Sequence, residues 1–274
     1  MSENIKFMLF TALAVVIFSV PAHSARRDGL NNNLLIEDHD DVFFLPQKAH
    51  SQYNKNRVRF DLNPNADTRG TFFASTGAGA WGIGIENGTT GIAPLQTAQR
   101  FQGFAAGQLI ALDPSLASDA DAIAQALPNQ IVDGFYSMKS GKNDFGLRLG
   151  LGSTGSSPGG DAADTSAFSL NLNLGFSRSG DFRFDTGLGV VFFTGSQDDA
   201  YDTTASQIDL YFRGYKKTGM KKVELGVLGN VGFGSASYEP EGGEAQDFSG
   251  ARAGVGVGPV YQLKSGIVAT YASL

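Results

Sequence analysis

Hydrophobic and polar residues alternate with a period of two along most of the chain after residue 56. The clearest run is 168–176 (FSLNLNLGF), in which every even position is apolar and every odd position is polar or Gly. A helix would scatter these apolar side chains around its axis, whereas a β-strand places all of them on one face. The pattern therefore predicts strands that have one apolar face and one polar face.

The same alternation recurs often enough to predict eleven strands. Their expected ranges are 57–63, 69–77, 80–87, 131–139, 143–153, 166–178, 181–193, 204–216, 220–234, 249–262 and 266–274. Several reach the ~9–11 residues that a tilted transmembrane strand needs. Single-chain bacterial barrels usually have an even number of strands. Two explanations therefore stay open: a further strand within 40–52 or 99–110, or a chain that stops before its closing strand.

The connections between the predicted strands alternate in length from the second strand onward. Short connections are expected at 78–79, 140–142, 179–180, 217–219 and 263–265, and long ones at 88–130, 154–165, 194–203 and 235–248. Outer-membrane barrels have short periplasmic turns and long external loops, whereas a Greek-key sandwich has no reason to follow this rule. We therefore predict an all-β fold, an up-and-down antiparallel transmembrane β-barrel of about 12 strands over residues 57–274. The longest connection also predicts a short helix that ends before Pro128.

The polar face of the predicted strands carries charged residues of both signs. In a bilayer the apolar side chains face lipid and the polar ones face the lumen. The expected lumen-lining residues are Arg57, Arg59, Asp61, Glu86, Arg148, Arg183, Asp185, Asp209, Arg213, Glu224 and Arg252. Two interpretations stay open: these side chains pair and fill a narrow barrel, or they line a polar pathway for solutes. Glycines on the same face leave room and slightly favour an opening, although Gly also permits the bends that closure of a barrel demands. They are Gly146, Gly150, Gly187, Gly189, Gly226, Gly232, Gly254 and Gly256.

The first 56 residues do not follow the strand pattern. Residues 1–24 are typical of a secretory signal, with Lys6 before an eleven-residue apolar run that Pro21 ends. This run is shorter than the about 20 residues that a membrane-spanning helix needs, and we expect cleavage before Ala25. Residues 25–56 are polar and irregular, and we expect a periplasmic or plug segment there.

Composition and charge narrow the class of protein. Gly makes up 36 of 274 residues, and the absence of Cys excludes disulfides and thiolate metal sites. The net charge of -6 gives no reason to expect nucleic-acid binding. Acidic residues gather in the predicted long connections and basic residues in the predicted short turns. One rim of the barrel should therefore be acidic and the other basic.

Residues 37–47 (EDHDDVFFLPQ) resemble the start of fatty-acid-channel-like outer-membrane barrels. That family often carries an acidic pair, an aromatic residue and an Asn-Pro before its first strand. The acidic pair at 40–41, the aromatic pair at 43–44 and Pro46 match, while Leu45 stands in place of the Asn. The resemblance implies an N-terminal segment that can enter the lumen as a plug.

Residues 57–274 resemble Gram-negative outer-membrane β-barrels in general, which implies the outer membrane as location and its lipid and lipopolysaccharide as partners. All three His residues precede residue 51, so we expect no His-dependent barrel enzyme, no catalytic residues, no metal and no cofactor.

The first functional hypothesis is a porin-like channel for passive passage of small polar solutes. The alternative is a plugged structural or surface-binding barrel whose acidic loops contact a partner or lipopolysaccharide. A secreted soluble β-protein is a third hypothesis, and the sequence does not indicate the solute or the oligomeric state.

Overall fold

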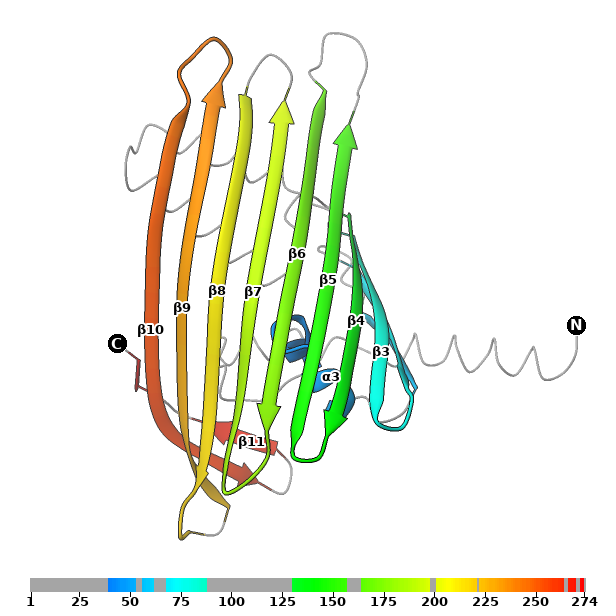
Figure 1. The fold of residues 1–274 in the computed structure, drawn as a ribbon, viewed down its shortest axis with the longest axis vertical. Helices are drawn as coiled ribbons and strands as arrows, with labels where there is room; N and C mark the ends of the chain where they lie inside the picture. The colour runs from blue at the N-terminus through cyan, green and yellow to red at the C-terminus, as the bar shows by residue number, and fades with distance from the viewer. Residues whose placement is uncertain are drawn as a thin grey trace, which may run out of the picture.

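A single antiparallel sheet forms almost all of the structure (Figure 1). The computed structural model describes residues 39–52, 56–61, 68–87, 130–156, 164–197, 201–220, 222–263, 266–269 and 272–273. From β1 to β11 the strands follow one another across the sheet in chain order. The prediction of an all-β, up-and-down antiparallel arrangement of about 12 strands is therefore confirmed, with 12 strands in the sheet.

The strand bounds match most of the ranges that the alternation predicts. They are β1 (Arg57–Asp61), β2 (Thr68–Ser75), β3 (Gly79–Asn87), β4 (Gln130–Ser140), β5 (Asn143–Ser156), β6 (Thr165–Arg178), β7 (Phe182–Gln197), β8 (Tyr201–Lys217), β9 (Val223–Pro240), β10 (Gln246–Leu263), β11 (Gly266–Ala269) and β12 (Ala272–Ser273). The predicted strand 266–274 is divided, because β11 and β12 each pair with β10. Within the described ranges no pairing joins β1 to β11 or β12.

Two hairpins extend further than predicted. β7 continues to Gln197 before β8 starts at Tyr201, and β9 continues to Pro240 before β10 starts at Gln246. The expectation of long connections at 194–203 and 235–248 was therefore wrong. Ser, Thr and acidic residues there give no apolar signal, yet their backbones continue the register of the apolar part of each hairpin.

Residues 39–52 are helical, so the hypothesis of a missed strand within 40–52 was wrong. The segment contains the 3-10 turn η1 (His39–Phe43) and the short helix α3 (Lys48–Gln52). The backbone makes a tight turn after Asp41, since the amides of Phe44 and Leu45 both donate to the carbonyl of Asp41. No helix in the described part of the chain is long and apolar enough to cross a membrane. The predicted signal, the helix before Pro128 and the strand at 99–110 lie outside the described residues.

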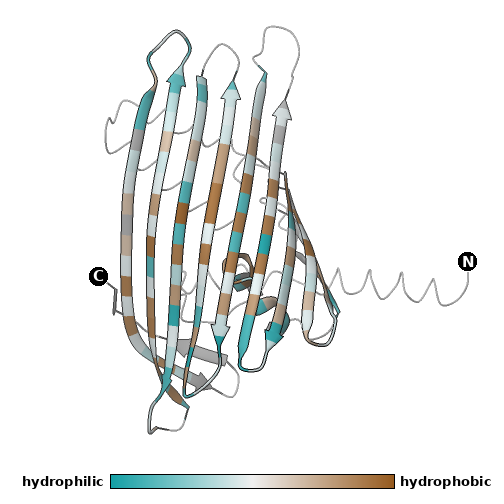
Figure 2. Ribbon diagram, in the orientation of Figure 1, coloured by the Kyte–Doolittle hydropathy of each residue, from teal (hydrophilic) through white to brown (hydrophobic). Residues whose placement is uncertain are grey.

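Hydrophobic and hydrophilic residues succeed one another along the strands (Figure 2), and the two faces of the sheet differ sharply in polarity. We call the face against which residues 39–52 pack the buried face, and the opposite one the exposed face. On β6, Leu170 and Leu174 are exposed, whereas Ser169, Asn171 and Asn173 between and beside them are at most 6% exposed. The same alternation recurs on β5, β7 and β8. Apolar side chains therefore point to the outside and polar ones to the inside, which reverses the arrangement of a soluble protein.

Aromatic side chains mark both edges of the apolar band on the exposed face. Near one edge the rings of Phe145, Phe176, Phe184 and Phe212 follow one another across four strands, with centroids 5.1, 5.7 and 6.1 Å apart. Phe168 and Phe192 lie near the other edge. Phe168 and Phe176 are eight residues apart on β6, which corresponds to about 26 Å at ~3.3 Å per residue.

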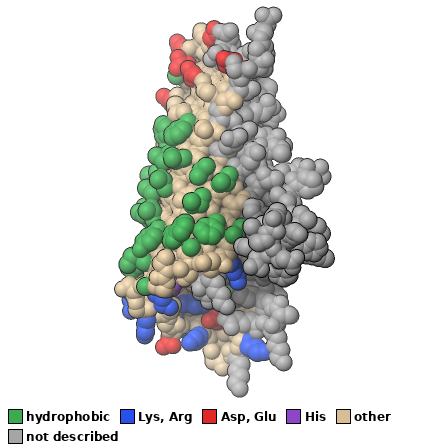
Figure 3. Space-filling view, turned by 90° about the vertical axis from the view of Figure 1, so that its right-hand side faces the viewer, with side chains coloured by type: hydrophobic (Ala, Val, Ile, Leu, Met, Phe, Trp, Pro, Cys, Tyr) green, Lys and Arg blue, Asp and Glu red, His purple; other side chains and the backbone are tan. Residues whose placement is uncertain are grey.

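Opposite charges lie beyond the two edges of this band (Figure 3). The acidic end carries Asp164, Asp202, Glu239, Glu241, Glu244 and Asp247, and the basic end carries Lys139, Lys142, Arg178, Lys216, Lys217 and Lys222. Asp144 and Asp181 are acidic exceptions at the basic end. Among the described residues, the segregation of charge thus follows the two sets of connections, as the sequence predicts.

Candidate functional site: the N-terminal segment on the buried face

Residues 39–52, here called the N-terminal segment, lie against the buried face near its basic end. Val42, Phe43 and Ala49 form one apolar cluster with Phe73 of β2 and with Ile131 and Phe135 of β4. The rings of Phe43 and Phe135 meet edge to face, with centroids 5.4 Å apart. These large apolar side chains of β2 and β4 depart from the rule of apolar outside and polar inside, because the N-terminal segment covers them.

Three glycines in one row of the sheet form a cradle for the turn at residues 44–47. Gly146, Gly175 and Gly187 pair across β5, β6 and β7. A methyl group at Gly146 would overlap the backbone of Gln47, and one at Gly187 would lie 2.6 Å from the carbonyl oxygen of Phe44. The space that these glycines leave is therefore filled by the N-terminal segment, and the expectation that Gly146 and Gly187 favour an opening was wrong.

Other inward glycines accommodate side chains of neighbouring strands. A methyl group at Gly150 would overlap the carboxylate of Asp133, and one at Gly189 would lie 2.8 Å from Nδ2 of Asn173. The small residues on the buried face therefore make room for larger polar neighbours. This arrangement packs the interior near the N-terminal segment instead of leaving it empty.

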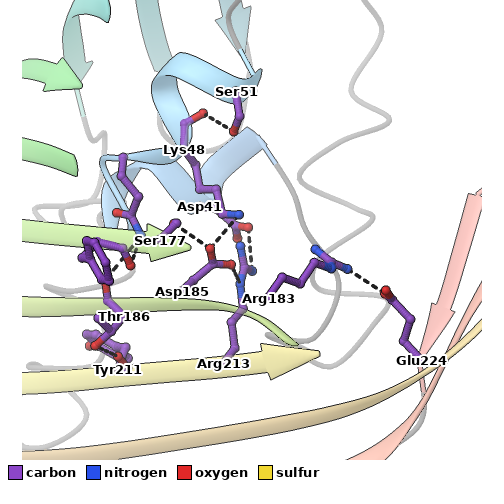
Figure 4. A network of polar contacts seen from close by, with 12 residues as sticks. Asp41, Lys48, Ser51, Ser177, Arg183, Asp185, Thr186, Tyr211, Arg213 and Glu224 are labelled. Carbon is purple, nitrogen blue, oxygen red and sulfur yellow. Dashed lines mark hydrogen bonds and ion pairs between the residues drawn. The ribbon is translucent and has the colours of Figure 1, made fainter. Parts of the chain in front are cut away.

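Four charged side chains of alternating sign join the N-terminal segment to the sheet (Figure 4). Two belong to the sheet: Arg213 Nε of β8 donates to Asp185 Oδ2 of β7 over 2.6 Å. The other two belong to the segment. Lys48 Nζ lies 2.7 Å from Asp185 Oδ1, and Arg213 Nη1 lies 2.7 Å from Asp41 Oδ2. Because each buried charge faces one of opposite sign, burial of the group is tolerated.

The serine next to this network adds a further bond. Ser177 Oγ of β6 donates to Asp185 Oδ1 over 2.6 Å. Gln47 lies between Asp41 and Lys48 and binds the turn to the sheet. Its Nε2 donates to the carbonyls of Phe176 and Thr186 over 3.2 and 3.3 Å. These polar contacts of the segment are on β6, β7 and β8, whereas its apolar cluster is on β2 and β4. The ring of Phe44 adds a contact with Tyr211 of β8, with centroids 5.9 Å apart.

Arg148 forms a second anchor, deeper in the interior. The side chains of Arg148 and Asp133 are both 0% exposed, and Nε of Arg148 donates to Asp133 Oδ1 over 2.8 Å. Its Nη1 donates to the carbonyl of Phe43 over 3.0 Å and to Asn173 Oδ1 over 3.2 Å. The guanidinium also lies 5.1 Å from the centroid of the Phe43 ring. Arg148 thus binds the N-terminal segment through its backbone, without requiring a charged partner there.

The structure places most described members of the predicted lumen-lining set on the buried face. Arg148, Asp185, Asp209, Arg213 and Glu224 are at most 8% exposed. Two pairs within the set are in contact, the pair of Asp185 with Arg213 and the pair of Arg183 with Glu224, whose Nη2 and Oε2 are 2.9 Å apart.

Of the remaining predicted residues, only Arg57 has a described side chain. Arg57 is exposed at the start of β1, where it pairs with Phe73. The side chains of Arg59, Asp61, Glu86 and Arg252 lie outside the described part of the structure. Five members of the predicted set are thus buried, and the structure shows which of them contact the N-terminal segment.

Several residues of the site were missed by the sequence analysis. Asp41, Gln47 and Lys48 belong to a segment without periodicity. The motif of residues 37–47 was a signal for Asp41 and Gln47, whereas Lys48 lies just after it. Asp133 lies between Ile131 and Phe135, which point to the same face of β4. That strand is apolar on both faces, so the alternation there did not distinguish inside from outside.

Comparison with known proteins adds no relative. Neither the protein-family models nor the curated proteins contain a match to this chain. The chemistry of the site must therefore be inferred from its geometry.

The arrangement is suited to holding a chain segment in place. Its charged groups are engaged with each other, and within the described ranges no three His, Asp or Glu side chains gather in a way that could bind a metal ion. Its contacts are ion pairs, hydrogen bonds and a small apolar cluster, which are all reversible. The site can therefore fix the N-terminal segment on the buried face or release it.

Proposed function

We propose that this chain is an outer-membrane β-barrel of a Gram-negative bacterium that acts as a porin-like channel for small polar solutes, with the N-terminal segment as its gate. The observation that carries the proposal is the reversed polarity of the sheet. Leu149 and Leu151 are 45% and 49% exposed, while Arg148 beside them is 0% exposed. In water this arrangement would be unfavourable, because burial of apolar side chains drives folding, whereas in lipid it is the expected one.

The dimensions of the exposed face agree with a bilayer. The apolar band of about 26 Å along β6 compares with about 25 Å for the apolar band of outer-membrane barrels, which is also flanked by aromatic girdles. Inside hydrocarbon an unpaired strand edge is costly. For this reason we propose that the sheet closes in the membrane, with β1 and the C-terminal strands at the seam.

The buried face supports the channel part of the proposal. It carries charged and amide side chains, which suit the passage of polar solutes through a lumen. The N-terminal segment covers this face from β2 to β8. If the segment moved away, the polar face would become accessible from the basic end, which corresponds to the periplasmic side in this class of protein.

Conductance in planar bilayers tests the proposal. The variant Asp41→Asn/Lys48→Met removes both charges that the segment contributes to the network, and leaves Asp185 and Arg213 of the sheet paired with each other. We expect low conductance from the unmodified protein and at least several-fold higher conductance from this variant, because the segment loses its two ion pairs. Ser51→Ala is the control, since Ser51 is exposed and bonds only the carbonyl of Lys48 among the contacts described.

A plugged structural or surface-binding barrel is the second candidate. The fully buried pair of Arg148 and Asp133 favours it, since this pair holds the segment at depth without an exposed group. The same experiment separates the two candidates. If both proteins fold, as shown by a heat-dependent shift in gel mobility, and neither conducts, then the channel is refuted and the plugged barrel is supported.

A further inference from the structure

A group of uncharged polar side chains lies on the buried face just beyond the N-terminal segment, towards the acidic end. Asn171 of β6 and Gln207 of β8 are level with each other, because both pair with Val191 of β7. Ser169 occupies the next inward position of β6. The row of Arg148 and Asn173 lies one step towards the basic end. This group therefore lies directly beyond the row of Arg148 and Asn173, towards the acidic end.

Hydrogen-bonding atoms of this group are buried without a partner among the described residues. Ser169, Asn171 and Gln207 are 6%, 1% and 2% exposed. The unpartnered atoms are Oγ of Ser169, both Nδ2 and Oδ1 of Asn171, and Oε1 of Gln207. Buried polar groups are almost always satisfied in folded proteins. Other buried atoms of the same face, Ser137 Oγ and Asn173 Nδ2, are also unpartnered among the described residues. Four such atoms on three neighbouring uncharged side chains point to an external partner.

The chemistry of the group indicates an uncharged partner. It offers a donor and acceptors but no net charge of its own, and the nearest charges are already engaged: Arg148 with Asp133, and Asp209 with the Nε2 of Gln207. A hydroxyl group both donates and accepts, so it can satisfy either type of atom. An ionic solute would find no unpaired counter-charge among these side chains.

Apolar and aromatic side chains border the group on the side of the acidic end. Ala167, Phe193 and Ala205 form a buried cluster, and Ala236 packs against it. Further along β8 and β9, the rings of Tyr201 and Tyr238 lie with their centroids 5.7 Å apart. Small-molecule sites combine such surfaces with a few placed polar groups. Sugars present both kinds of surface, since their C–H faces are apolar and their hydroxyl groups are polar.

We infer that Ser169, Asn171 and Gln207 form a subsite for uncharged polyhydroxylated solutes, that is, mono- or disaccharides. The amides bind the hydroxyl groups, and the apolar cluster beside them contacts the C–H face of the sugar. The inference rests on the proposed channel and deepens it, because it names the class of solute and the side chains that select it.

Block of the ion current by sucrose tests this subsite. The measurement uses the Asp41→Asn/Lys48→Met protein in planar bilayers, with and without the further changes Asn171→Leu and Gln207→Leu. We expect sucrose to reduce the current in a saturable manner. The two leucines should raise the half-saturating sucrose concentration about tenfold, because hydrogen bonds to the solute are lost. A reduction that is linear in sucrose, or equal in both proteins, would overturn the inference.

The control variant is Asn230→Leu, an amide of β9 that pairs with Tyr211 and Gly254 and lies outside the proposed subsite. Its half-saturating sucrose concentration should not change. Calorimetric titration of sucrose into the unmodified protein in detergent separates the subsite from the channel. Binding that the two leucines abolish, in a protein that does not conduct, would refute the channel and keep the subsite. Absence of both binding and saturable block in a conducting protein would refute the subsite alone.

Discussion

At the scale of single residues, the packing of the buried face depends on glycines, which leave space for groups from other parts of the chain. Gly146 and Gly175 have no side chain at the points where Gln47 reaches the sheet. Arg148 crosses from β5 to Asp133 on one side and to the carbonyl of Phe43 on the other. The sequence predicts that Arg148 points inward, from alternation alone. The partners of Arg148 could not be predicted, because they are determined by how the N-terminal segment packs against the sheet.

The glycine cradle leads to a direct prediction for Gly146→Ala. The added methyl group overlaps the backbone of Gln47, and overpacking of this kind costs about 1–3 kcal/mol. The N-terminal segment should therefore detach more often, and trypsin should cleave after Lys48 about tenfold faster than in the unmodified protein. Gly155→Ala on the same strand is the control, because its methyl group would lie 3.8 Å from the nearest atom, the carbonyl oxygen of Thr165. Equal cleavage in both variants would show that the turn at 44–47 does not rest on the cradle.

At the scale of the element, each strand combines an apolar part with a polar extension. On the exposed face of β8, Ile208, Leu210 and Phe212 belong to the apolar band. Ser206 pairs with Phe192 at the edge of the band, and Thr204 and Asp202 follow towards the acidic end. Ser206 Oγ lies 3.0 Å from Ser235 Oγ on the neighbouring β9. The alternation predicts the apolar part well. The extension was missed because its residues are mostly polar on the exposed face. Their pairing follows from the register of the backbone, which hydrophobic alternation in the sequence does not indicate.

The two parts of β8 should respond differently to a charge. Leu210→Arg places a guanidinium in the middle of the apolar band, where the cost of folding into lipid is about 2–4 kcal/mol. Ser206→Arg introduces the same side chain on the same face at the edge of the band, opposite Phe192, where the cost is about 0–1 kcal/mol. Urea titration of folding into lipid vesicles measures both values. If Leu210→Arg, at a position 50% exposed, has no larger effect than Ser206→Arg, the exposed face does not contact lipid.

At the scale of the whole molecule, the charges define a direction. The connections at one end of the sheet are acidic and the turns at the other are basic (Figure 3). The N-terminal segment lies near the basic end, where Lys48 and Arg213 meet Asp185. In the proposed orientation the acidic end faces the outside of the cell and the N-terminal segment closes the lumen from the periplasmic side.

Labelling of single cysteines on intact cells tests this orientation. The chain has no Cys, so each variant carries one reactive thiol. A membrane-impermeant maleimide should label Glu244→Cys, in the turn between β9 and β10, without disruption of the cells. Ser179→Cys, in the turn between β6 and β7, should be labelled only after the outer membrane is permeabilised. The opposite pattern would reverse the orientation, and labelling of neither thiol before permeabilisation would argue against a surface location.

The sequence by itself determined the strands, their order and the face to which most side chains point. The physical reason is that the period of two is a local property, since backbone geometry sends successive side chains to opposite faces. Only the tertiary structure decided where residues 39–52 lie, what fills the space beside Gly146 and Gly187, and which charged side chains form pairs. Several of those contacts join residues more than a hundred positions apart, such as Asp41 and Arg213. They depend on the shape of the folded sheet, which no local pattern in the sequence records.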